Sequence, residues 1–212
     1  MRFIFKTPVC CGLLVVITLL SRDVSGQING RVIYREADFK DKIDSLRKTT
    51  KNIVLPAGDP LETATYVALS HYPELAGHTI KIKYKKNVRH PVTASWSFRN
   101  LFRARKRHVY VLLLSTDAFV NRLDFNRQLG VIGHELAHFA YYRERSGLGM
   151  AWWGIRYVTS KKFRYQFEKD ADRATVDHGL GWQLLHVSFY MKSDEVREYM
   201  KQKGYMQSTS DR

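Results

Sequence analysis

The chain has 212 residues, a formal net charge of +15 and a hydrophobic content of 44%, which suits one domain with a packed core. Its two cysteines, Cys10 and Cys11, lie near the N-terminus, so a chain processed after residue 26 would have no disulfide, zinc–thiolate site or cysteine nucleophile. The positive charge is compatible with an acidic partner or an anionic surface, and equally with a well-solvated surface.

The first 26 residues are typical of a signal peptide. Arg2 and Lys6 give a positive start, an apolar run extends from Cys10 to Leu20, and small residues precede Gln27. The run is shorter than the roughly 20 residues that a membrane-spanning helix needs. We therefore expect cleavage near Gly26/Gln27, secretion or export to the periplasm, and a mature chain without a transmembrane span. An uncleaved anchor is the alternative.

The pattern after the signal peptide predicts helices and then strands. Residues 27–58 are expected to form an N-terminal helical segment, with a charged helix over 31–52. A second helix starts at the cap Asp59 and stops before Pro73. Alternating or continuous apolar residues predict three strands, of which the last is the most apolar and hence central, over residues 78–85, 92–98 and 108–114.

The segment from Arg99 to Arg107 is strongly basic. Its simplest interpretation is a solvated connection between the second and third strands. A nucleic-acid patch is the alternative, but the export signal argues against a nucleic-acid partner.

From about Leu123 the pattern is helical. Apolar residues recur at Ile132, Leu136 and Phe139, which predicts a core-facing stripe on a helix that ends near Gly147. A loop over 147–153 and further helices are expected, the helices over 160–178, 180–192 and 193–204, before a polar tail at 207–212. The sequence thus predicts an α+β fold in one domain over residues 59–206, with a small, mostly antiparallel sheet and a helical C-terminal half.

Two histidines enclose a glutamate in the run His134-Glu135-Leu136-Ala137-His138. Residues four apart lie on the same face of a helix, so His134 and His138 can bind one metal ion, usually zinc. Glu135 is placed to take a proton from a metal-bound water.

A hydrolytic zinc site needs a third protein ligand. Glu168 lies on the next long predicted helix, and packing of the two helices would bring its carboxylate to the metal. Asp172, four residues later, faces the same way. An ion pair of Glu168 with Arg164 or Lys169, and ligation by His178 instead, are the alternatives.

The run His-Glu-Leu-Ala-His followed by Glu-x-x-Ala-Asp resembles the gluzincin metallopeptidases. Within them it is most similar to the CAAX-processing and HtpX-type membrane proteases and to their soluble relatives, the minigluzincins. The resemblance covers about residues 124–178 and is clear at the two motifs. It implies a zincin-like fold, Zn²⁺ bound by His134, His138 and Glu168, Glu135 as the general base, and Asp172 as a residue that supports a ligand. The lack of a hydrophobic span after the signal peptide favours the soluble relatives.

The expected function is exported, zinc-dependent hydrolysis of peptide bonds in a peptide or protein substrate, with endopeptidase action favoured because no element that recognises a chain terminus is evident. The alternative is a secreted basic protein that binds an anionic surface or an acidic partner and keeps a structural or vestigial zinc site. The strand over 92–98 is expected to align an extended substrate through its backbone. The group that stabilises the oxyanion is left open among Tyr141, Tyr157, Arg173, His178 and His186.

Overall fold

The computed structural model describes residues 26–28, 31–50, 53–86, 92–116, 119–187 and 189–206. The predicted signal peptide up to residue 25 and the predicted tail at 207–212 lie outside these residues. Within the described ranges, no helix combines the length and the apolar character that a membrane span requires.

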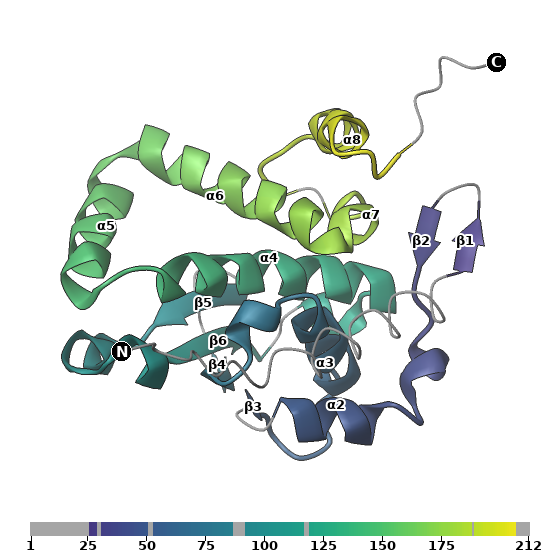
Figure 1. Ribbon diagram of the computed structural model, residues 1–212, viewed down its shortest axis with the longest axis horizontal. Helices are drawn as coiled ribbons and strands as arrows, with labels where there is room; N and C mark the ends of the chain where they lie inside the picture. Colours follow the sequence, from purple (N-terminus) through teal and green to yellow (C-terminus); the bar gives the residue numbers. More distant parts are fainter. Residues whose placement is uncertain are drawn as a thin grey trace, which may run out of the picture.

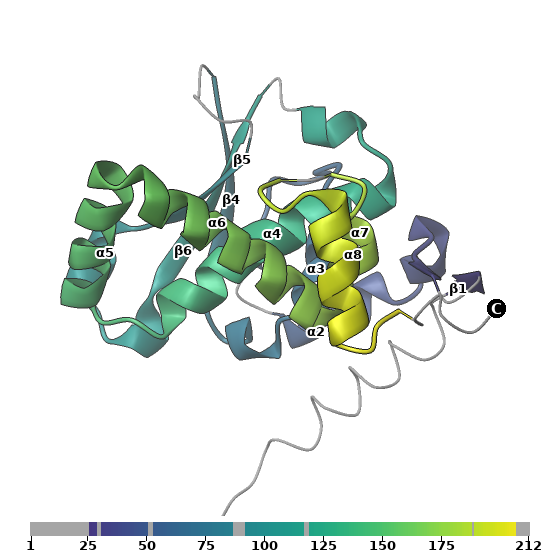
Figure 2. The same cartoon turned by 90° about the horizontal axis from the view of Figure 1, so that it is seen from above.

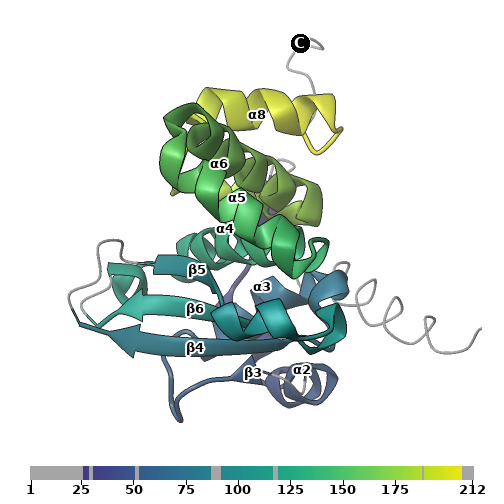
Figure 3. The ribbon, with the colours of Figure 1, turned by 90° about the vertical axis from the view of Figure 1, so that its left-hand side faces the viewer.

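The described chain has an α+β architecture (Figure 1). Its helices are α2 (Ile43–Thr49), α3 (Glu62–Ser70), α4 (Phe125–Arg143), α5 (Gly147–Thr159), α6 (Lys161–Thr175), α7 (Gly181–Leu184) and α8 (Ser193–Gln202). Its strands are β1 (Gly26–Ile28), β2 (Arg31–Ile33), β3 (Ile53–Val54), β4 (Thr79–Lys85), β5 (Val92–Trp96) and β6 (Val109–Ser115). Figure 3 shows the sheet, α4, α6 and α8 following one another from bottom to top.

The main sheet is mixed and has the strand order β3-β4-β6-β5. The β3–β4 and β4–β6 pairs are parallel, and only the β5–β6 pair is antiparallel. The prediction of a mostly antiparallel sheet is therefore wrong. The reason is that β5 turns back to the outer edge, so that β4 and β6 become neighbours, and alternation along a strand does not encode which strand lies beside it.

The N-terminal region also differs from its prediction. Residues 31–52 were expected to be one helix, but they contain β2, which pairs with β1, a 3₁₀ turn at Glu36–Phe39 and the short helix α2. Phe39 and Leu46 do face the core, although different elements carry them. The spacing of a few apolar residues therefore identified the buried side chains but not the backbone that presents them.

Helix α5 begins where a loop was predicted. Ser146 accepts a hydrogen bond from the backbone N–H of Gly149 and so caps the helix. Gly147 packs against Leu101, and a Cβ on Gly147 would lie 2.9 Å from the Leu101 side chain. Gly147, one of the glycines that suggested a loop, is thus required by a close contact, and α5 connects α4 to α6.

Helices α4 and α6 both begin with a side-chain cap. Asp124 accepts from the backbone N–H of Arg127 at the start of α4, and Ser160 accepts from Phe163 at the start of α6. Ile132, Leu136 and Phe139 of α4 are buried in the core, where Phe139 stacks on Tyr110 of β6 with ring centroids 5.1 Å apart. This packing fixes α4 against the sheet and leaves its motif residues on another face.

Candidate metal centre

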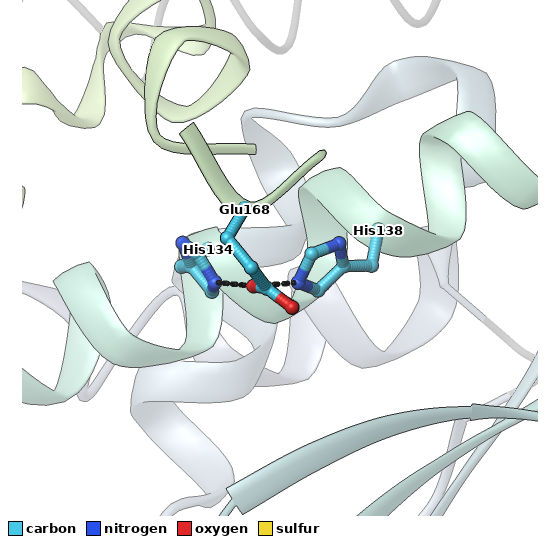
Figure 4. Close-up of side chains that lie close together, drawn as sticks. All are labelled: His134, His138 and Glu168. Atoms are coloured by element: carbon cyan, nitrogen blue, oxygen red, sulfur yellow. Dashed lines mark hydrogen bonds and ion pairs between the residues drawn. The ribbon is translucent and has the colours of Figure 1, made fainter. Parts of the chain in front are cut away.

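Helices α4 and α6 bring three potential metal ligands together (Figure 4). The Oε2 atom of Glu168 lies 3.3 Å from Nε2 of His134 and 3.1 Å from Nε2 of His138. All three side chains are buried, and one ligand atom from each lies within 4.8 Å of the other two. The group could therefore bind a metal ion.

The spacing of the donor atoms fits this interpretation. In a tetrahedral site with metal–ligand bonds near 2.0–2.1 Å, two ligand atoms are about 3.3 Å apart, and both Glu168–histidine distances are close to that value. The donor set of two imidazoles and one carboxylate leaves a fourth position for a small molecule.

The electrostatics of the group favour a positive charge. Burial alone would lower the pKa of His134, but the hydrogen bonds with Asp172 and Glu168 outweigh burial and raise it to about 10. Burial would likewise raise the pKa of Glu168, but hydrogen bonds from His134, His138 and Tyr157 hold it well below its usual range. Both pKa shifts have the direction that favours a positive charge between the imidazoles and the carboxylates.

Asp172 is fully buried behind His134. Its Oδ1 atom lies 2.8 Å from Nδ1 of His134, and its Oδ2 atom accepts the backbone N–H groups of Tyr190 and Met191 at 2.9 and 2.6 Å. Because a carboxylate only accepts, Nδ1 of His134 carries the proton and its Nε2 atom is directed toward Glu168. The Nδ1 atom of His138 has no such partner among the described residues.

Glu135 is held beside this group by strand β5. Its Oε2 atom accepts the backbone N–H of Ala94 at 2.6 Å, and the side chain is only 7% exposed. The Ala94 N–H points away from β6 and toward α4, so this hydrogen bond fixes the carboxylate against the free edge of the sheet.

The three potential metal ligands and Glu135 line one cleft of about 540 Å³. His134, Glu135 and His138 of α4 contribute to its lining together with Glu168 of α6. Its other walls are β5, the inner face of α5 and the segment after α7, represented by residues 92–96, Met150, Trp153, Tyr157, Phe189 and Tyr190.

The alternatives considered for single residues lie elsewhere. His178 is hydrogen-bonded to Glu74 at 2.8 Å and to the backbone carbonyl of Ala174, so it does not belong to the group. Lys169 pairs with Glu195 rather than with Glu168. Of the five groups proposed for the oxyanion, Tyr157 is among the lining residues of the cleft, and its hydroxyl donates to Oε1 of Glu168 at 2.7 Å.

Some residues of this cleft were not anticipated. Phe189 stacks on His134 with ring centroids 4.4 Å apart, Tyr190 lines the cleft, and the Ala94 N–H holds Glu135. Phe189 and Tyr190 follow a short helix and belong to no motif, and a backbone N–H has no sequence signal. The prediction that the strand over 92–98 aligns the substrate anticipated that this strand would lie beside the site, but not that its backbone would hold Glu135.

The chain matches no protein-family model, no curated protein and no solved structure. The functional conclusion therefore depends on the geometry of this cleft.

Proposed function

We propose that the protein is a zinc-dependent peptidase that hydrolyses peptide bonds in the cleft between β5, α4 and α5. The observation that carries the proposal is the convergence of His134, His138 and Glu168, buried in a cleft that also contains Glu135. The resemblance of the two motifs to the gluzincins supports the same activity.

Zinc is the metal that this donor set favours. Two imidazoles and one carboxylate are the ligands of known hydrolytic zinc sites, which keep one position open. When bound, zinc acidifies a water molecule and polarises the substrate carbonyl. Asp172 supports the ligand His134 by fixing its tautomer and increasing its basicity.

Glu135 is the proposed general base. It follows His134 directly in α4. Glu168 is hydrogen-bonded to His134 and His138, whereas the carboxylate of Glu135 is hydrogen-bonded to the backbone N–H of Ala94. It accepts a proton from the attacking water and delivers that proton to the amine that leaves. The hydrogen bond from Ala94 keeps the carboxylate in one orientation during both transfers.

Strand β5 is the proposed substrate guide. It is an outer strand of the sheet and contributes residues 92–96 to the cleft lining. Backbone groups alternate between the two edges of a strand, so Trp96 directs its N–H and C=O groups, and Ala94 its C=O group, away from β6, while the Ala94 N–H is already bonded to Glu135. An extended peptide can pair with these groups as an added strand.

Tyr157 is the proposed donor to the oxyanion, and its single hydroxyl proton, which goes to Oε1 of Glu168 in the structure, would turn to the oxyanion when a substrate binds. Burial and the hydrogen bond with Glu168 raise its pKa, so the hydroxyl keeps its proton at neutral pH. Tyr190 also lines the cleft, and burial raises its pKa as well. We also propose, from the N-terminal sequence alone, that the enzyme is exported.

The Glu135→Gln variant tests the proposal. Purified protein is loaded with zinc and incubated with a mixture of unstructured peptides, and products are identified by mass spectrometry. We expect the wild type to cleave and the variant to lose at least about 100-fold in rate, because a glutamine cannot accept the proton. Zinc content should remain unchanged, because Glu135 is not a ligand.

Glu144→Gln is the matched control, since Glu144 is an exposed carboxylate just after the same helix, and it should cleave like the wild type. Equal cleavage by Glu135→Gln would contradict the role of Glu135. A wild type that binds zinc but cleaves nothing would favour the alternative, a basic binding protein with a structural or vestigial site.

A further inference from the structure

Helix α5 has a second, outward face that is apolar and exposed. Leu148 and Val158 are 81% and 77% exposed, and Trp152 and Ile155 are 63% and 56% exposed. Their spacing places them within one stripe along the helix, which we call the α5 outer face. Figures 1 and 2 both show α5 at one end of the molecule, and no other described helix or strand lies beyond it.

The inner face of the same helix is used differently. Met150, Trp153 and Tyr157 point into the cleft, and Trp153 stacks on Tyr157 with centroids 4.9 Å apart. The helix is therefore held by its inner face, so the apolar outer face is not needed for the packing of the fold. Monomeric soluble proteins rarely keep such a contiguous apolar surface without a binding role.

The segments that flank the α5 outer face are strongly basic, and Glu144, just before α5, is the acidic residue at their edge. The sequence has no acidic residue between Glu144 and Glu168, and none between Glu74 and Asp117. The 3₁₀ turn at Phe98–Phe102 packs against α5. The side chain of Arg105 donates a hydrogen bond to the backbone carbonyl of Glu144, just before α5. The basic residues exposed on these segments include Arg99, Arg103, Arg105, Arg107, Arg156, Lys161 and Lys162.

We propose that the α5 outer face docks the protein on an anionic lipid surface. A helix with one apolar face, an interfacial tryptophan and flanking Lys and Arg lies in the plane of the headgroups, with the apolar side chains in the acyl boundary. The basic side chains beside it attract anionic headgroups.

A second copy of the chain fits this face less well. Two such faces brought together would oppose positive charge to positive charge with no acidic residue from either segment to compensate. An acidic protein would satisfy the charge but not the exposed Leu148, Trp152 and Ile155. Because α5 is also a wall of the cleft, docking would hold the cleft close to the lipid surface. The inference does not depend on hydrolysis, since lipid binding requires no metal.

Quenching of Trp152 by lipid tests the proposal directly. The full chain is mixed with vesicles of equal parts phosphatidylglycerol and acyl-brominated phosphatidylcholine, which quench only tryptophans that reach the acyl region. We expect strong quenching in the wild type and the loss of most of it in Trp152→Phe, which keeps the face apolar. Vesicles of brominated phosphatidylcholine alone should quench weakly. Binding without quenching of Trp152 would overturn the proposal, and so would the absence of binding.

Matched variants measure the contribution of the face. Ile155→Glu should weaken sedimentation with the anionic vesicles about fivefold or more, whereas Val54→Glu, at a side chain that is 50% exposed on β3, should not. Lys161→Ser/Lys162→Ser should weaken binding about tenfold, more than Lys40→Ser/Lys48→Ser, which removes the same charge elsewhere. The proposal would be overturned if Ile155→Glu bound the vesicles as well as Val54→Glu, and the Lys161/Lys162 variant as well as the Lys40/Lys48 variant. A wild-type dimer in lipid-free solution that Ile155→Glu dissociates would overturn it in favour of a contact between copies.

Discussion

Asp172 uses both of its carboxylate oxygens, one for His134 and one for two backbone N–H groups of the segment after α7. Asp172→Asn replaces one oxygen by an NH₂ group, which donates and cannot accept. The side chain can then no longer accept hydrogen bonds both from His134 and from the two backbone N–H groups. We expect the affinity for zinc to fall about 10–100-fold, because the His134 ring loses the acceptor that fixes it. Competition with a chelator of known affinity measures this.

Asp170→Asn is the control for that variant. Asp170 lies on the same helix but pairs with Arg173 at the surface, so its loss should leave zinc affinity unchanged. If both variants bind zinc equally well, Asp172 supports the fold and not the metal centre.

His71 is the residue whose protonation should weaken the fold. It is neutral in the folded protein, because Nδ1 bonds to the carbonyl of His178 at 2.8 Å and Nε2 accepts from the Tyr34 hydroxyl at 3.3 Å. Burial, aided by the nearby charge of His178, lowers its pKa from 6.5 to about 4. The unfolded chain binds this proton more readily than the folded one, so stability contributed above pH 6.5 is lost as the pH falls toward 4.

The comparison with His71→Gln isolates this effect. The free energy of unfolding of the wild type should fall relative to the variant by on the order of 2–3 kcal/mol between those two pH values. Chemical denaturation at several pH values measures both proteins under the same metal conditions. In Tyr34→Phe the dependence should be smaller, because Nε2 no longer accepts a hydrogen bond. Parallel curves for the wild type and His71→Gln would contradict the assignment.

Helices α4 and α7 approach each other through Gly130. A Cβ at this position would lie 2.5 Å from the backbone carbonyl oxygen of Gln183 and 2.8 Å from its carbonyl carbon. Backbone atoms cannot move aside like a side chain, so Gly130→Ala should destabilise the protein by about 1–3 kcal/mol. Denaturant unfolding monitored by circular dichroism measures this.

Gly154→Ala gives the opposite expectation on α5. No atom lies within 4 Å of a Cβ built there, and alanine favours a helix over glycine by about 0.5–1 kcal/mol. This variant should be slightly more stable than the wild type. If Gly130→Ala were stabilising too, α7 would have to move freely against α4.

The sequence was most informative where local chemistry determines the element. Local patterns predicted helices from about Leu123 and over 160–178. The need for a third ligand on a helix packed against the first predicted that Glu168 would lie beside His134 and His138, as the distances bear out. It was least informative where an element depends on distant neighbours. The parallel β4–β6 pair requires β5 to lie outside both strands, and the helix α5 requires a glycine that fits against Leu101.

At the scale of the whole molecule, the candidate metal centre joins the helix that packs on the sheet to the helix that carries the C-terminal elements. His134 and His138 come from α4, Glu168 comes from α6, and Asp172 links α6 to the segment before α8. A metal ion held by both helices would therefore stabilise the complete fold and not one element, since the unfolded chain has no preformed site.

Removal of zinc should accordingly lower the thermal stability of the protein. At a free zinc concentration 100 times the dissociation constant, binding stabilises the folded state by about 2.7 kcal/mol, which for a chain of this size corresponds to a Tm change of about 5–10 °C. Differential scanning calorimetry of the zinc-loaded and chelator-treated protein measures the change, and magnesium, which prefers oxygen ligands, should not reproduce it. The shift should vanish in His138→Ala and persist in Glu135→Gln. Loss of the shift in Glu135→Gln would mean that this carboxylate binds the metal, and the division between ligands and base would have to be redrawn.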